Sequence, residues 1–116
     1  MFTGYFGKVK TYPSNLKYVS IAKFARFWSG SVYTKLAPSP ELLEIKDAKE
    51  YTYRYKQEVL TKLDPRAVYE DLGNDAVLLC YEKWDDIKTG KSFCHRRIVA
   101  QWLEEHIEGL SVRELE

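Results

Sequence analysis

A continuous apolar run, Ala76-Val-Leu-Leu-Cys80, constrains the fold of this chain more than any other feature of its sequence. The run has the length of a strand and follows a turn-forming stretch, Gly73-Asn-Asp75. Because its apolar residues do not alternate with polar ones, both faces of the strand must be buried. This pattern is typical of a central strand in a parallel sheet, and we predict that residues 76–80 form one.

An N-cap residue followed by proline marks a helix start at two places in the chain. Ser39 and Asp64 are good N-cap residues, and each is followed by proline, which suits the first helical position. Apolar residues at helical spacing predict one helix within residues 47–63 and another over residues 96–108, and Gly73 is expected to end the helix between them. Each of these signals is local, so each predicts an element without reference to the rest of the chain.

Two further strands are predicted near the N-terminus, before these helices. Residues 2–6 are aromatic and bounded by glycine, and residues 18–22 are apolar and β-branched. Strands followed by helices indicate an α/β fold with a small, mainly parallel sheet flanked by helices. At 116 residues the chain has the length of one domain, so we expect a single α/β domain over residues 1–116.

Charge is distributed unevenly along the chain. Residues 1–40 contain six lysines and arginines and no aspartate or glutamate, although the whole chain has a net charge of +1. The same segment contains nine aromatic residues. Cations next to aromatic rings suit phosphates next to bases, so we predict an anionic small molecule or a nucleic acid as partner. The alternative is that the rings belong to the core and the lysines surround it.

Composition excludes several other classes of protein. No apolar run approaches the roughly 20 residues of a membrane span, and the first residues lack the apolar stretch of a signal peptide. Two cysteines without CxxC spacing predict no disulfide framework, so we expect a reduced, cytoplasmic protein without membrane contact. Cys80, Cys94 and His95 could begin a zinc site, but no fourth ligand has suitable spacing. We therefore predict no metal and no other cofactor.

The start of the last predicted helix is electrostatically unusual. The sequence Cys94-His-Arg-Arg97 places cations at the positive end of a helix dipole, which favours anions. A bound phosphate or carboxylate would relieve the repulsion, and so would Glu82 or Asp85 as an internal counter-ion. We predict that His95, Arg96 and Arg97 bind a ligand, with Arg96 facing a pocket that Glu82 also borders.

Two residues near this helix start are candidates for catalysis. Glu82 follows the buried strand, where partial desolvation would make it an acid or base, and Cys94 next to cations is expected to have a lowered pKa and to act as a nucleophile. Tyr81 and Tyr33 could bind or orient the ligand. The alternatives are that Glu82 pairs with Arg96 and that Cys94 is a small buried residue between helix and sheet.

Several of these segments resemble the domain of unknown function 488 family (DUF488). The more specific pair is Leu78–Lys83, with a Leu-Leu-Cys-x-Glu strand end, and Cys94–Arg96, with a Cys-His-Arg helix start. A second pair, Leu36–Ser39 and Tyr53–Leu60, is similar to short members of the family. Together the segments cover roughly residues 36–103.

The resemblance implies a small α/β fold in which Cys80–Glu82 and Cys94–Arg96 lie next to each other at one end of the sheet. It implies no particular activity, because the family is named for lacking one. One departure from the family pattern is the eleven-residue spacing between Glu82 and Cys94. The additional residues, Trp84–Ser92, would form either a lid or a longer surface loop.

Three classes of function follow from these observations. The leading hypothesis is a protein that binds a phosphate-bearing ligand, a nucleotide or a nucleic acid, at the start of the last helix, with Glu82 acting on a glycosidic bond if the protein is an enzyme. The alternatives are a cysteine-based sulfur or redox protein and a non-catalytic interaction or inhibitor protein. The sequence predicts neither turnover nor oligomeric state.

Overall fold

All five strands of the protein run parallel in one sheet, in the order β3-β2-β4-β1-β5. The computed structural model describes residues 1–116. The strands are β1 (Phe2–Tyr5), β2 (Lys17–Ser20), β3 (Ser31–Val32), β4 (Ala76–Cys80) and β5 (Arg113–Glu114). The predicted central strand is β4, and all five of its residues are buried. The predicted α/β class and the parallel sheet are therefore confirmed.

Five α-helices and three short 3₁₀ helices connect the strands. They are α1 (Pro40–Leu43), α2 (Ala48–Glu58), α3 (Pro65–Leu72), α4 (Trp84–Lys88), α5 (His95–His106), η1 (Phe6–Thr11), η2 (Thr34–Leu36) and η3 (Leu60–Lys62). Both predicted caps are present, because the side chain of Ser39 accepts a hydrogen bond from the Leu42 N–H and that of Asp64 from the Arg66 N–H. The helix predicted within residues 47–63 ends at Glu58, and a 3₁₀ turn continues the chain.

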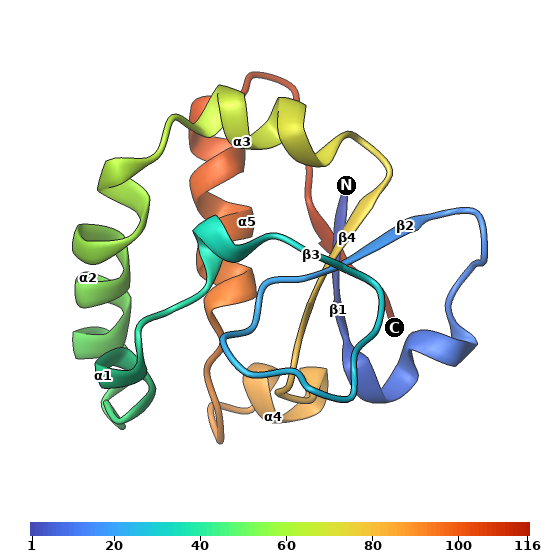
Figure 1. The fold of residues 1–116 in the computed structure, drawn as a ribbon. Coiled ribbons are helices and arrows are strands. Elements are labelled where there is room, and N and C mark those ends of the chain that lie inside the picture. The colour runs from blue at the N-terminus through green and yellow to red at the C-terminus, as the bar shows by residue number, and fades with distance from the viewer.

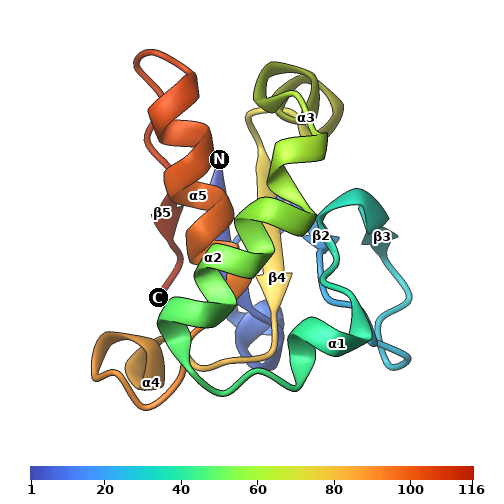
Figure 2. The ribbon, with the colours of Figure 1, turned by 90° about the vertical axis from the view of Figure 1, so that its left-hand side faces the viewer.

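The sheet separates two hydrophobic clusters. Helices α2, α3 and α5 cover one face of the sheet, as Figures 1 and 2 show, and the larger cluster lies beneath them. On β4, Ala76 and Leu78 belong to this cluster, whereas Val77 and Leu79 belong to a smaller one with Phe6 of η1. Successive residues of a strand point to opposite faces, so the unbroken apolar run supplies both cores.

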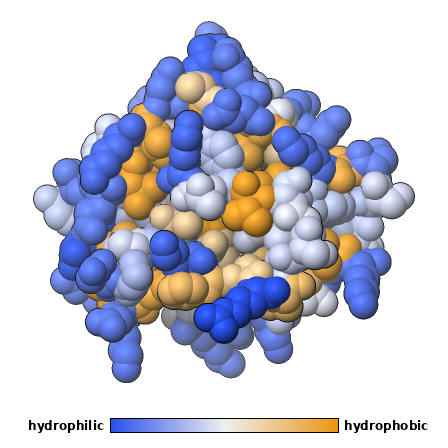
Figure 3. Space-filling view, viewed as in Figure 1, coloured by the Kyte–Doolittle hydropathy of each residue, from blue (hydrophilic) through white to orange (hydrophobic).

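Helix α5 is amphipathic, as its sequence predicts. Val99, Ala100 and Leu103 are buried in the larger cluster, and Trp102 packs against it. On the face shown in Figure 3, hydrophobic side chains form small patches separated by hydrophilic ones. No helix combines the length and the apolar composition that crossing a membrane requires.

The carboxyl end of β4 is where the functional segments meet. Helix α4, the first turn of α5 and helix α1 all lie toward this end of the sheet (Figure 1). The segment that follows Glu82 forms the short helix α4 rather than an extended loop. Ligands of parallel α/β sheets bind beyond the carboxyl ends of the strands, so this end is the place to look for a site.

Candidate functional site

A pocket of about 400 Å³ opens at the carboxyl end of β4. Its walls come from the end of β4, the start of α5, the segment after β2, and residues around α1 and the start of α2. Four of the predicted site residues line it together: Tyr81, Glu82, Cys94 and His95. The pocket therefore lies where the predicted strand end and helix start meet, and several of its walls come from other segments.

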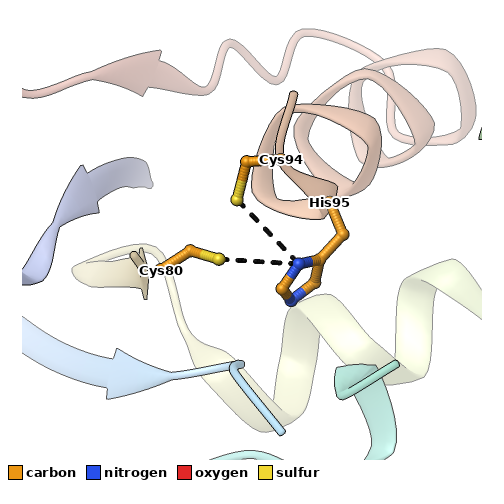
Figure 4. A group of neighbouring side chains, drawn as sticks. All are labelled: Cys80, Cys94 and His95. Carbon is orange, nitrogen blue, oxygen red and sulfur yellow. Dashed lines mark hydrogen bonds between the residues drawn. The ribbon is translucent and has the colours of Figure 1, made fainter. Parts of the chain in front are cut away.

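Two sulfur atoms, an imidazole and a carboxylate converge at the base of the pocket. Cys80 Sγ donates a hydrogen bond to Glu82 Oε2 at 3.3 Å and lies 3.5 Å from His95 Nδ1. Cys94 Sγ lies 3.9 Å from the same nitrogen. Figure 4 shows the three side chains of Cys80, Cys94 and His95 pointing toward one another from β4 and α5. The cluster combines two nucleophilic atoms with two proton acceptors.

The orientation of His95 is determined by its other ring nitrogen. His95 Nε2 lies 2.7 Å from the carbonyl oxygen of Ile21, and a carbonyl can only accept a hydrogen bond. Nε2 therefore carries a proton and donates it to Ile21. In the neutral ring, the lone pair is then on Nδ1, which faces both sulfur atoms.

Burial determines the electrostatics of this cluster. It raises the pKa of the Cys94 thiol well above its ordinary value, and the adjacent Cys80 raises it further. The expectation of a lowered pKa for Cys94 is therefore wrong, because the cost of burying a thiolate exceeds the stabilisation by the helix terminus. Burial lowers the pKa of His95, but Cys94, the Ile21 carbonyl and Glu82 together raise it. Burial also raises the pKa of Tyr51, which forms part of the pocket wall.

Arg96 points away from this pocket. Its side chain is fully buried and forms a bidentate ion pair with Glu114 of β5, with Nε 3.1 Å from Oε1 and Nη2 2.9 Å from Oε2. The predicted orientation toward the pocket and Glu82 is therefore wrong. The repulsion at the helix start is relieved within the fold, but by a different carboxylate from either Glu82 or Asp85. Burial lowers the pKa of Arg96, but Glu114, Cys94 and Cys80 together raise it above its ordinary value.

Arg97 belongs to the same structural network as Arg96. The Arg97 side chain is half-buried, donates hydrogen bonds to Thr3 Oγ1 at 2.8 Å and to the Val112 carbonyl at 3.3 Å, and lies over the Trp84 ring. Tyr33 is also outside the pocket, where it donates a hydrogen bond to Asp71 Oδ2 at 2.6 Å. The ligand-binding roles of Arg97 and Tyr33 stay predictions, with no support from the position of the pocket.

The structure adds residues that the sequence analysis did not select. Exposed lysines from three different segments border the pocket: Lys23, Lys46 and Lys91. Aromatic walls are formed by the predicted Tyr81 together with three rings that were not predicted, Phe24, Tyr51 and Phe93. Only Lys23 and Phe24 carried a signal, since they belong to the basic and aromatic first third of the chain. The others come together only when the chain folds.

The position of Cys80 changes what the cluster can bind. As the last residue of a strand predicted to be buried on both faces, Cys80 is expected to belong to the core. In the structure its sulfur lies with the ligand atoms of Cys94 and His95, all within 4.8 Å of one another and all on buried residues. These three side chains are the ones that could hold a metal ion.

Comparisons with known proteins identify a family. A family model described as DUF488-N3a, "Active DUF488-N3 subclade", matches residues 5–107. The match includes every residue that lines the pocket. No curated protein and no solved structure gives a significant match.

Proposed function

The chain belongs to the DUF488 family, in a subclade described as active, and we propose that it cleaves the glycosidic bond of a phosphate-bearing nucleotide, free or within a nucleic acid. The observation that carries this proposal is the position of Glu82. Its carboxylate stands in a pocket whose walls include four aromatic rings and whose rim carries lysines. Neither the family match nor the fold assigns this activity.

The shape and composition of the pocket support a nucleotide as ligand. A volume of about 400 Å³ is within the usual range for small-molecule sites. Phe24 and Tyr81 are 55% and 43% exposed, so their rings can stack on a base without rearrangement of the core. The lysines at the rim, and not the buried Arg96, are then the groups that attract the phosphate. The role predicted for the helix start therefore passes to Lys23, Lys46 and Lys91.

Glu82 supplies the chemistry in this proposal. A carboxylate stabilises the positive charge that develops on the sugar when the bond to the base breaks. Glu82 acts as the general base and accepts a proton from a water molecule, whose oxygen bonds to the anomeric carbon of the sugar. The nucleobase leaves and takes up a proton. The net reaction consumes one water molecule and yields the sugar phosphate and the free base. The Cys80 thiol, which donates to Glu82 Oε2, orients the carboxylate.

The test combines a binding measurement with a measurement of turnover. Nucleotides and short single-stranded oligonucleotides are screened by thermal shift, and release of the free base is then followed by chromatography. We expect Glu82→Gln to retain binding and to slow base release by at least about 100-fold, the lower range for loss of an acid–base group. Glu70→Gln, which changes an exposed glutamate of α3, is the matched control. Absence of binding by every nucleotide, or base release that survives Glu82→Gln, would contradict the proposal.

A second candidate function is thiol chemistry. The positions of the two cysteines favour Cys80, rather than Cys94, as the reactive thiol. Cys80 Sγ lies close to two proton acceptors, His95 Nδ1 and Glu82 Oε2. In an alkylation by iodoacetamide, the sulfur bonds to carbon, iodide leaves and the thiol proton passes to one of these acceptors. Mass spectrometry would show preferential labelling of Cys80, and His95→Gln would slow it. Equal, slow labelling of both cysteines in the folded protein would exclude this candidate.

A further inference from the structure

The Cys80, Cys94 and His95 cluster has a property that neither candidate function uses. Its three ligand atoms come from the last residue of β4 and from the N-cap and first residue of α5, and they meet beside the pocket (Figure 4). We propose that these three side chains bind a zinc ion, with a fourth coordination position open to the pocket. The proposal goes beyond the nucleotide hypothesis and does not depend on it.

The distances already match a tetrahedral site. With Zn–S bonds of about 2.3 Å and Zn–N bonds of about 2.0 Å, tetrahedral angles place sulfur and nitrogen about 3.5 Å apart and two sulfurs about 3.8 Å apart. The observed distances from His95 Nδ1 are 3.5 Å to Cys80 Sγ and 3.9 Å to Cys94 Sγ. All pairs among the three atoms are within 4.8 Å. Only small movements of the side chains are needed to accommodate an ion.

The hydrogen bond on the far side of the His95 imidazole supports metal binding independently of the distances. Histidines that bind metals commonly donate their second ring N–H to a carbonyl or carboxylate, which sets the tautomer and the direction of the free lone pair. His95 does so through Nε2, 2.7 Å from the Ile21 carbonyl oxygen. The lone pair of Nδ1 is thereby directed at the two sulfurs.

Charge balance also suits a metal at this depth. An isolated thiolate is costly to bury, and Cys80 and Cys94 are only 3% and 4% exposed. A divalent ion with two thiolates and a neutral imidazole has no net charge, so the whole assembly can be buried. Binding releases the protons of both thiols and any proton on His95 Nδ1. Thiolates with imidazole favour zinc over the hard cations, which prefer oxygen ligands.

Three protein ligands correspond to an open, catalytic type of zinc site. Such sites keep one position for water or substrate, whereas structural sites have four protein ligands. The lack of a fourth ligand at suitable spacing, on which the prediction of no metal depended, does not count against a site of this open type. All three ligands line the pocket, so the open position faces the space next to Glu82. A zinc-bound water there would lose its proton more easily than free water.

Cobalt substitution tests the site directly and without any substrate. The full chain is treated with a chelator under reducing conditions and then titrated with Co²⁺. We expect one equivalent of Co²⁺ to produce thiolate charge-transfer absorption and the intense visible bands of tetrahedral cobalt, and one equivalent of Zn²⁺ to remove them. Each of Cys80→Ser, Cys94→Ser and His95→Gln should weaken Zn²⁺ binding by more than about 100-fold. Mutating residues that only hydrogen-bond to metal ligands already lowers metal affinity by about 10–100-fold.

The control is the other histidine of the chain. His106→Gln changes an exposed side chain in the last turn of α5 and should leave the cobalt spectrum unchanged. If a cluster variant fails to fold, the site is tested by alkylating the protein without substitutions. Zn²⁺ should protect both cysteines from iodoacetamide, and a chelator should make them reactive again. A folded protein that shows no charge-transfer absorption with excess Co²⁺, or a spectrum that survives Cys94→Ser, would overturn the proposal. Loss of base release alone would not, because metal binding is measured without nucleotide.

Discussion

The first turn of α5 presents two different environments on neighbouring residues. Arg96 is buried against β5, where both oxygens of Glu114 accept hydrogen bonds from its guanidinium group. His95 is also buried, but its Nδ1 faces two sulfur atoms, and burial raises the pKa of one of them, the Cys94 thiol. One environment is therefore a closed ion pair, and the other is a cluster of ligand atoms next to an open pocket.

The contrast between the ion pair and the cluster distinguishes structural residues from candidate site residues better than residue type does. Arginine at a helix start suggests an anion site, yet Arg96 has its anion within the chain. Cysteine at the end of a buried strand suggests core packing, yet Cys80 borders the pocket and contacts Glu82. What distinguishes the two environments is whether each polar group already has a partner of suitable charge.

Breaking the ion pair should have the largest effect. Arg96→Met leaves the buried Glu114 carboxylate without its guanidinium partner, which should lower the free energy of unfolding by about 3–5 kcal/mol. Urea denaturation followed by circular dichroism measures this change. Arg54→Met, which breaks the partly exposed Arg54–Glu58 pair, is the control and should cost less than about 1 kcal/mol. A loss within 1 kcal/mol for Arg96→Met would show that the pair is not structural.

Zinc should stabilise the cluster of Cys80, Cys94 and His95 and leave the Arg96–Glu114 ion pair unaffected. At a Zn²⁺ concentration of about 100 times the dissociation constant, the chelator-treated protein should gain about 2.7 kcal/mol. Thermal denaturation with and without Zn²⁺ measures the gain. The gain should disappear in Cys94→Ser and persist in His106→Gln. An equal gain in both variants would indicate binding elsewhere on the protein.

Removing the charge of Glu82 should affect function far more than stability. Glu82 is half-buried and accepts a hydrogen bond from the Cys80 thiol rather than from a cation, so Glu82→Gln should change the free energy of unfolding by about 1 kcal/mol or less. Base release should nevertheless fall, as described above. A loss of several kcal/mol in urea denaturation would place Glu82 with the scaffold instead of the site.

The lysines at the rim of the pocket should have the smallest effect on stability. Lys46→Gln changes an exposed side chain and should alter the free energy of unfolding by less than about 0.5 kcal/mol. Nucleotide affinity should fall several-fold, and binding of an oligonucleotide should weaken steeply with salt through counterion release. Isothermal titration at two salt concentrations measures both effects. Lys56→Gln on α2 is the control, and equal losses in the two variants would contradict a specific role for Lys46.

Most of the fold could be predicted because its signals are local. The unbroken apolar run of β4 required two buried faces, and the Ser39-Pro40 and Asp64-Pro65 caps marked helix starts within a few residues. The helix predicted within residues 47–63 is shorter than expected, since its apolar spacing does not reveal where α2 gives way to the 3₁₀ turn η3. The family resemblance implied that the segments around Cys80 and Cys94 lie together, and the structure places them so.

The partners within the site depended on tertiary structure. Glu114 meets Arg96 only because a two-residue strand, β5, returns to pair with β1, and His95 meets Ile21 across 74 positions of sequence. Cap geometry and helical periodicity arise from interactions between residues a few positions apart, so the sequence alone determined the central strand and the helix starts. Which charge is neutralised and which lone pair faces a pocket depend on the order of strands in the sheet. For that physical reason, only the folded chain could make Arg96 part of the scaffold and bring Cys80, Cys94 and His95 together.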